Sequence, residues 1–593
     1  MLAADTGLGL APWELKLFLK ELDLGDDDRV SADRFCGIYT FLASRPPTPA
    51  APPATAPSTE PVEAAAAAPA APEPGVTTEP VVTTSAPAVP GDEAAKTREE
   101  PRTPIGVPFP PEFVLDPTGV VPVERADWSF CVTDEPPSVE SRWRRADGAG
   151  QCAAYPFLGA ARAPQSRAVR SDASSSSSSP RRLPAASALA ALHAAPSTDG
   201  VDAFAAHPNE VSGVFHAFHQ LLRFELGVDA AAADAGAGWW RCDKSAFLDL
   251  QSVYGASEDE TNAARIDESS IDVAFVMRRA DLASRLAGDL GGSGSATAAQ
   301  ALLTLFAKNH NLLAARVADK MKKDESLAPE SLADSVFQVA RHANCAAFRA
   351  VVLKDYLPFM RSGQHLAHVP EDFSNEAPRG ACVSVELDLL MRAVASAAPR
   401  ETETDGDSHE EASSSVAEAL ARASARRCGL GARRSLPARM APSEAAAVRR
   451  ARAAGACTLN AFRAAHGLAR WVDFDEMTAG EEALIQTLAD LYGGNVDDVE
   501  LYTGFMCERN VADTGACLTA TARETAGRML RALVSGDAFF SEKFLAGDDM
   551  AAAAEAAEFG KDATLAGLLE EHAGVTVAGA SAFEVGALVM KDL

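Results

Sequence analysis

The feature that most constrains the fold is a strongly apolar stretch at residues 212–226, with the sequence SGVFHAFHQLLRFEL. Its apolar side chains recur every three or four residues, the spacing that places them on one face of an α-helix. These core candidates are Val214, Phe215, Phe218, Leu221 and Leu222. A plain core helix would not need the polar side chains of His216, His219 and Gln220. We therefore predict a buried helix around which the rest of the chain packs.

Bulk properties exclude several classes of function. The formal net charge of -29 argues against a nucleic-acid partner, because a polyanion would be repelled. No apolar run reaches the roughly 18 residues that a membrane-spanning helix needs. The N-terminus lacks a basic region followed by an apolar core, so we expect no signal peptide and favour the cytoplasm. The 10 cysteines include no close CxxC pair, which indicates free thiols.

Residues 11–43 are typical of a helix, an acidic loop and a second helix, and they resemble an EF-hand. Asp23 and Asp27 occupy the first and fifth positions of the loop. Asp28, however, stands in place of the turn glycine, and Arg34 replaces the glutamate that gives calcium two oxygens. We interpret residues 1–45 as a degenerate helix-loop-helix that packs or binds a protein partner. Calcium binding at Asp23 and Asp27 is the less favoured alternative.

A linker follows at residues 46–127, rich in proline, alanine and threonine. It has few large apolar side chains, so it cannot bury enough surface to offset the loss of chain entropy on folding. We therefore expect disorder up to residue 127 and order from residue 128 onward.

A series of motifs beyond residue 128 resembles, in the right order, those of the animal haem peroxidase and cyclooxygenase superfamily. The matching segments are 144–150 (RRADGAG), 212–226, 245–257 (SAFLDLQSVYGAS), 304–315, 354–358 (KDYLP) and 391–399. The resemblance implies a mainly α-helical, peroxidase-like domain over residues 128–593. Low-complexity insertions interrupt it near 165–182 and 400–440.

The residues that carry the family's chemistry are replaced. In the family's pattern, Phe224 stands at the distal histidine, Ala395 at the proximal histidine that binds iron, and Gly291 or Gly292 at the catalytic arginine. Gln220 is the polar residue retained near the pocket. Haem peroxidases need a base, a cation and a basic axial ligand. We therefore expect haem to be absent here, although the family binds it.

Other residues could act as substitutes. Met391 and Cys382 are soft candidate ligands for iron. His216 and His219 lie on the predicted distal helix but off the face of Phe224. We interpret these histidines as polar helix residues, with a weak metal-binding pair as the alternative.

A candidate calcium site follows from the same resemblance, because the segment at 245–257 wraps a calcium ion in peroxidases. Its oxygens would come from Glu225, Ser245, the Phe247 carbonyl, Asp249 and Gln251. Hard cations take six to eight oxygens, so this set would need water as well. The alternative is a loop that folds over the distal helix without an ion.

These observations favour a peroxidase-like protein that has lost peroxidase activity and acts as a binding or interaction module. The alternative is a haem-binding oxidoreductase of the peroxidase or fatty-acid oxygenase type, active in the response to oxidative stress, with substituted haem ligands. Whether the protein is an enzyme stays open at this point, and we favour the answer that it is not.

Overall fold

The structure is a computed structural model that describes residues 143–590. Its gaps are 151–158, 164, 170–182, 199–200, 228–241, 266–291, 322–328, 362–381, 400–414, 434, 511–514, 517–518, 536, 538 and 540–559. All described elements belong to one unit of the chain, 95–593. The predicted helix-loop-helix with Asp23 and Asp27, the linker, and most of the low-complexity insertion near 165–182 lie outside the described residues. Of the insertion predicted near 400–440, residues 400–414 and 434 lie outside them, whereas the rest is described and contains a regular helix at Val416–Ala425.

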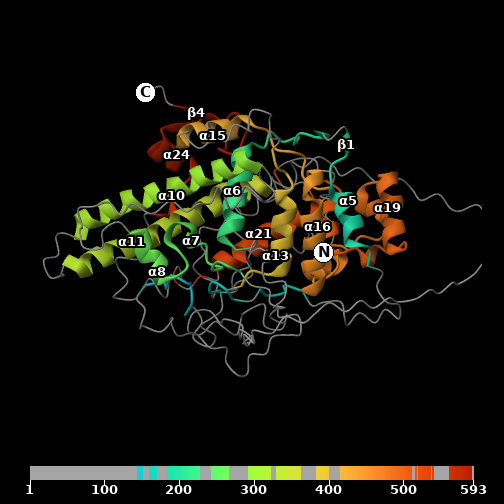
Figure 1. The fold of residues 1–593 in the computed structure, drawn as a ribbon, viewed down its shortest axis with the longest axis horizontal. Helices are drawn as coiled ribbons and strands as arrows, with labels where there is room; N and C mark the ends of the chain where they lie inside the picture. Colours follow the sequence, from blue (N-terminus) through green and yellow to red (C-terminus); the bar gives the residue numbers. More distant parts are fainter. Residues whose placement is uncertain are drawn as a thin grey trace, which may run out of the picture. The chain divides into compact units, whose positions relative to one another are not determined.

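Helices dominate the described chain, as predicted (Figure 1). The first half contains α5 (Ala186–His193), α6 (Gly213–Glu225), α7 (Gln251–Tyr254), α8 (Glu258–Ala264), α10 (Gly292–Met321), α11 (Pro329–Val351), the π-helical η4 (Val352–Tyr356), α12 (Leu357–Arg361) and α13 (Val385–Ala395). The second half contains α15 (Val416–Ala425), η6 (Ala438–Met440), α16 (Ala441–Ala453), α17 (Leu459–Ala465), α18 (Phe474–Thr478), α19 (Glu482–Tyr492), η7 (Val496–Asp498), α20 (Leu501–Cys507), α21 (Ala520–Ser535) and α24 (Leu565–Ala573).

Two small antiparallel sheets complete the described elements. One pairs β1 (Ser197–Thr198) with β2 (Val201–Asp202), and the other pairs β3 (Val575–Val577) with β4 (Leu588–Met590). The predicted mainly helical fold is therefore confirmed. None of the described helices combines the length and the hydrophobicity that crossing a bilayer requires.

The predicted apolar helix is α6, and it lies in the middle of the unit between α10 and α13 (Figure 1). The Ser212 hydroxyl caps it by accepting from the Val214 amide at 3.3 Å. Every residue of α6 except Phe224 is buried. Its first residue must be small, because a Cβ on Gly213 would lie 2.8 Å from the Ala423 carbonyl oxygen of α15. The apolar period of the sequence thus reflects a helix enclosed on nearly every side.

The long helix α11 continues into the π-helical segment η4 and then into α12. This wide turn directly precedes Pro358, whose ring would clash with the preceding turn of a regular α-helix. The segment carries Tyr356 into the core beside α6, where it is fully buried.

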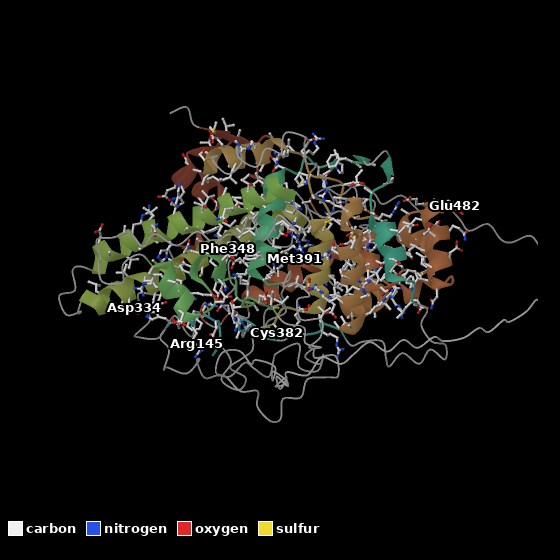
Figure 2. All side chains as sticks on the ribbon, in the orientation of Figure 1. Arg145, Asp334, Phe348, Cys382, Met391 and Glu482 are labelled. Carbon is white, nitrogen blue, oxygen red and sulfur yellow. The ribbon has the colours of Figure 1, made fainter. Side chains whose placement is uncertain are left out.

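Interior positions such as Phe348 and Met391 are surrounded by other side chains (Figure 2).

Candidate functional site

Helices α6 and α13 stand where the family's distal and proximal helices are expected, and they contact each other directly. His216 Nε2 donates to the Ala395 carbonyl oxygen at 3.0 Å, and His219 Nε2 donates to the Met391 carbonyl oxygen at 2.8 Å. A carbonyl oxygen only accepts, so both imidazoles carry a proton on Nε2. All four residues are buried. Two histidines of one helix thus bind the backbone of the other; we call this pair of contacts the histidine clamp.

His219 also binds Tyr356. Its Nδ1 accepts from the Tyr356 hydroxyl at 2.6 Å, and its ring lies beside those of Phe215 and Tyr356, with centroid distances of 6.2 and 6.0 Å. Burial, reinforced by the charge of Arg223, lowers the pKa of His219 well below its ordinary value. A neutral ring is what an accepting Nδ1 requires. The imidazole therefore connects η4, α6 and α13.

The residues at the end of α6 do not face α13 in the way that the motif comparison implied. Phe224 is half-buried, and its ring centroid lies 4.8 Å from the Lys244 ammonium. Arg223 is fully buried and donates to Gln220 Oε1 at 2.8 Å. Gln220 Nε2 lies 3.5 Å from His216 Nε2. The two histidines reach α13, whereas the sequence analysis interpreted them as polar helix residues, with a weak metal-binding pair as the alternative. Their spacing, three residues apart on one helix, is the signal that paired them, but it did not indicate backbone acceptors on α13.

The proximal side lacks a nitrogen donor at the family's position. Ala395 is fully buried at the end of α13, and the position of the asparagine that orients the proximal histidine is Ala447 on α16. The two helices are joined instead by Arg392, whose Nε and Nη2 donate to Glu444 Oε1 at 3.0 and 2.7 Å.

Glu444 is the centre of a buried polar group that the sequence analysis did not identify. The Tyr502 hydroxyl donates to its Oε2 at 2.6 Å, and His193 Nδ1 lies 3.6 Å from the same oxygen. Burial alone would raise the pKa of Glu444, but His193 and the charge of Arg392 lower it to about 2. Its carboxylate is therefore ionised, and the group joins α5, α13, α16 and α20.

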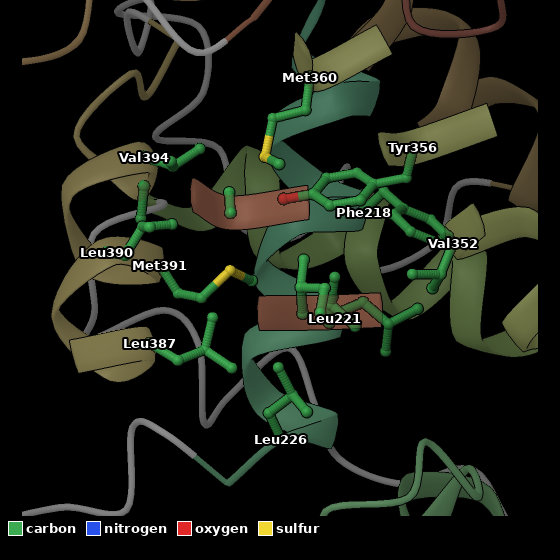
Figure 3. Close-up of a cluster of buried hydrophobic side chains, with 14 of the residues drawn as sticks. Phe218, Leu221, Leu226, Val352, Tyr356, Met360, Leu387, Leu390, Met391 and Val394 are labelled. Carbon is green, nitrogen blue, oxygen red and sulfur yellow. The ribbon is translucent and has the colours of Figure 1, made fainter. Parts of the chain in front are cut away.

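Apolar side chains surround α6 and cover the side of α13 that faces it (Figure 3). The cluster includes Phe218, Leu221 and Leu226 of the α6 region, Val352, Tyr356 and Met360 of η4 and α12, and Leu387, Leu390, Met391 and Val394 of α13. Ligand pockets usually measure several hundred Å³, about 300 to 1,000. A cavity beside α13, lined by Ala393, Val394, Ala397 and Phe505, measures only about 20 Å³. The facing residues of α6 and α13 contact each other directly through the histidine clamp, so in this arrangement they do not fit a porphyrin between them.

The substitute ligands for iron do not form a metal-binding group in the described part of the chain. Met391 packs into the apolar cluster, and Cys382 is a buried free thiol just before α13. Among the described residues, no three or more His, Cys, Asp or Glu side chains gather where they could hold a metal ion.

The predicted oxygen donors of the 245–252 loop do come together beside the end of α6. The Ser245 hydroxyl donates to Asp249 Oδ1 at 2.8 Å, and Gln251 Oε1 accepts from the Ser245 amide at 2.8 Å. Glu225 Oε1 accepts from the Ser252 amide at 3.1 Å. Burial raises the pKa of Glu225, and the charge of Lys244 opposes this shift. Phe247 is buried in the same loop.

Comparison with known proteins agrees with this fold. The sequence model of the animal haem peroxidase family matches residues 241–369 and 441–580. A bifunctional dioxygenase and epoxy alcohol synthase of Fusarium oxysporum is 24% identical over 69% of this chain, which spans 36% of that relative's length.

Solved structures with the same fold share little sequence identity with it. Fatty acid alpha-dioxygenase of Arabidopsis thaliana has a TM-score of 0.57 at 13% identity, covering 77% of this chain and 85% of its own. The Oryza sativa enzyme has a TM-score of 0.53 at 15% identity, covering 78% and 89%. Peroxidase A of Dictyostelium discoideum has a TM-score of 0.51 at 13% identity, covering 73% and 97%. The part of the chain that the family model matches, residues 241–369 and 441–580, is therefore an animal haem peroxidase domain, and the solved structures share its fold.

Proposed function

We propose that this protein has the peroxidase fold without peroxidase activity, and that it acts as a binding or interaction module. The observation that carries the proposal is the histidine clamp. It joins α6 to α13 at 3.0 and 2.8 Å, between the two helices that would enclose haem in the family.

The chemistry of the replaced positions supports the same conclusion. Peroxide cleavage needs a base on the distal side and a basic ligand that donates electron density to iron. Phe224 has no proton to exchange, and its ring lies against Lys244. Ala395 offers only its backbone carbonyl, which accepts from His216. The two described positions therefore supply neither function.

A scaffold that keeps its packing but not its chemistry can still present surfaces to a partner. The net charge of -29 favours a basic or neutral partner over nucleic acid. A contact through the helix-loop-helix at residues 1–45 stays a prediction, because those residues lie outside the described chain. A location in the cytoplasm also stays a prediction.

The second candidate function is a haem-binding oxidoreductase of the peroxidase or fatty-acid oxygenase type. The similarity of this chain to fatty acid alpha-dioxygenases and to a bifunctional dioxygenase favours this second function. Met391 would be a candidate sulfur ligand, because this side chain extends from α13 into the apolar cluster beside α6 (Figure 3). Binding haem there would require the histidine clamp to open.

Turnover assays separate the two functions. The full chain, incubated with haemin, is assayed for hydrogen peroxide-dependent oxidation of a phenolic donor and for oxygen uptake with a long-chain fatty acid. We expect both rates to equal those of free haemin. General acid–base catalysis alone contributes roughly 10² to 10⁴. A rate about 10³-fold above free haemin in either assay would support the oxidoreductase and refute the proposal.

A further inference from the structure

The loop at residues 245–252 places two buried carboxylates, Glu225 and Asp249, at the end of α6. We propose that two cations of the chain itself, Arg144 and Lys244, neutralise these carboxylates in place of a divalent metal ion. The inference concerns only this loop and does not depend on whether haem binds.

Arg144 is the cation on the Asp249 side. Its Nη1 lies 3.8 Å from Asp249 Oδ2, and its Nη2 donates to Asp537 Oδ2 at 2.5 Å. The guanidinium carbon lies 5.3 Å from the centroid of Phe247, a residue of the same loop, and 5.1 Å from that of Phe539. Arg144 is itself buried. A fixed positive charge therefore already occupies the neighbourhood of the loop's central carboxylate.

The anions around Arg144 are matched by a second arginine. Arg349 Nη1 donates to Asp537 Oδ2 at 2.6 Å, so Arg144 and Arg349 together face Asp249 and Asp537. All four side chains are buried. The group has two positive and two negative charges without any ion.

Lys244 is the cation on the Glu225 side. Its ammonium lies over the Phe224 ring at 4.8 Å and 3.5 Å from the Ser252 hydroxyl, while the Ser252 amide donates to Glu225 at 3.1 Å. Phe224 stands at the position of the family's distal histidine. The same replacement that removes the base therefore supplies an aromatic face for the lysine.

Ser245 and Gln251, the other two side chains of the predicted calcium set, are held by hydrogen bonds within the protein. The Ser245 hydroxyl donates to Asp249, Gln251 Oε1 accepts from the Ser245 amide, and Gln251 Nε2 donates to the Ala146 carbonyl at 2.7 Å. Calcium takes six to eight oxygens, and its charge would be added to a group of carboxylates already balanced by Arg144, Arg349 and Lys244. The sequence left two hypotheses open for this loop, a calcium site and a loop without an ion. We infer the loop without an ion.

The test measures calcium dependence directly. The melting temperature of the full chain is recorded in millimolar calcium and in chelator, and calcium binding is measured by titration calorimetry. We expect equal melting temperatures and no heat of binding. A higher melting temperature in calcium, lost in Asp249→Ala, would overturn the proposal.

Variants then test the cations themselves. Arg144→Met should lower the melting temperature equally in both buffers, and Arg144→Lys, which keeps the charge, should lower it less. Arg316→Met is the control, because Arg316 is 53% exposed and pairs with Glu571 at the surface. An Arg144→Met protein as stable as the control would refute the assignment. Should the Arg144 variants not fold, the calorimetry of the unchanged protein still decides between the two readings.

Discussion

Replacing His219 with phenylalanine should show how much the histidine clamp contributes to stability. The substitution keeps an aromatic ring beside Phe215 and Tyr356 but removes two buried hydrogen bonds, at 2.8 Å to the Met391 carbonyl and at 2.6 Å with the Tyr356 hydroxyl. Each buried group that loses its partner costs about 1 to 3 kcal/mol. We therefore expect His219→Phe to lower the free energy of unfolding by about 3 kcal/mol.

A double-mutant cycle isolates the bond between the two side chains. Tyr356→Phe alone should cost about 1 to 2 kcal/mol, because only the hydroxyl is lost. The double variant should then be about 1 kcal/mol more stable than the sum of the single effects predicts, since both remove the same bond. Urea unfolding of the full chain, followed by circular dichroism, gives all four free energies.

The matched control for this cycle is His572→Phe on α24. His572 is half-buried and makes one side-chain contact, at 3.2 Å to Asn309, so the change should cost less than about 1 kcal/mol. A cost below about 0.5 kcal/mol for His219→Phe would mean that the clamp contributes no stability, and additive effects in the cycle would mean that the His219–Tyr356 bond contributes none.

The remaining predictions concern buried carboxylates. Burial raises the pKa of Glu508 to about 7 despite the hydrogen bonds that it accepts from Thr521. The protonated carboxyl group contributes its full stabilisation below pH 4.5, the ordinary pKa of the group, and this stabilisation is lost as the pH rises through 7. The free energy of unfolding of Glu508→Gln, measured by urea unfolding, should therefore rise by about 3 kcal/mol relative to that of the wild-type protein between pH 4.5 and 8. Glu444→Gln should lower the free energy of unfolding by about 3 kcal/mol at pH 7, because it leaves the buried Arg392 without its counter-charge. That cost should shrink as pH falls from 4.5 towards 2, where the wild-type carboxylate is itself protonated.

Local patterns in the sequence predicted the helices and the loop well. The period of apolar residues at 212–226 predicted α6, which the structure finds at Gly213–Glu225. The order of the motifs predicted the superfamily, and the 245–257 motif identified the donors that meet beside α6. These features depend on residues close together in the chain, where spacing determines which side chains share a face.

The contacts that define the site could not be predicted in the same way. His216 and His219 bind backbone carbonyls of α13, and a carbonyl acceptor has no signature in the sequence because every residue carries one. The bond from Arg144 to Asp537 joins positions 393 residues apart. Such pairs depend on how the helices pack, and packing depends on the whole chain.

The central claim is that the space between α6 and α13 is closed by the chain's own side chains. Titration of the full chain with haemin, followed in the Soret region, tests it most directly. The comparison variant carries Phe224→His together with Ala395→His, which restores both family histidines. We predict no sharp Soret band for the wild-type protein, and any binding that the substitutions restore should be confined to the variant. A tight one-to-one Soret shift in the wild-type protein would contradict the account, because haem would then occupy the space that the histidine clamp now spans.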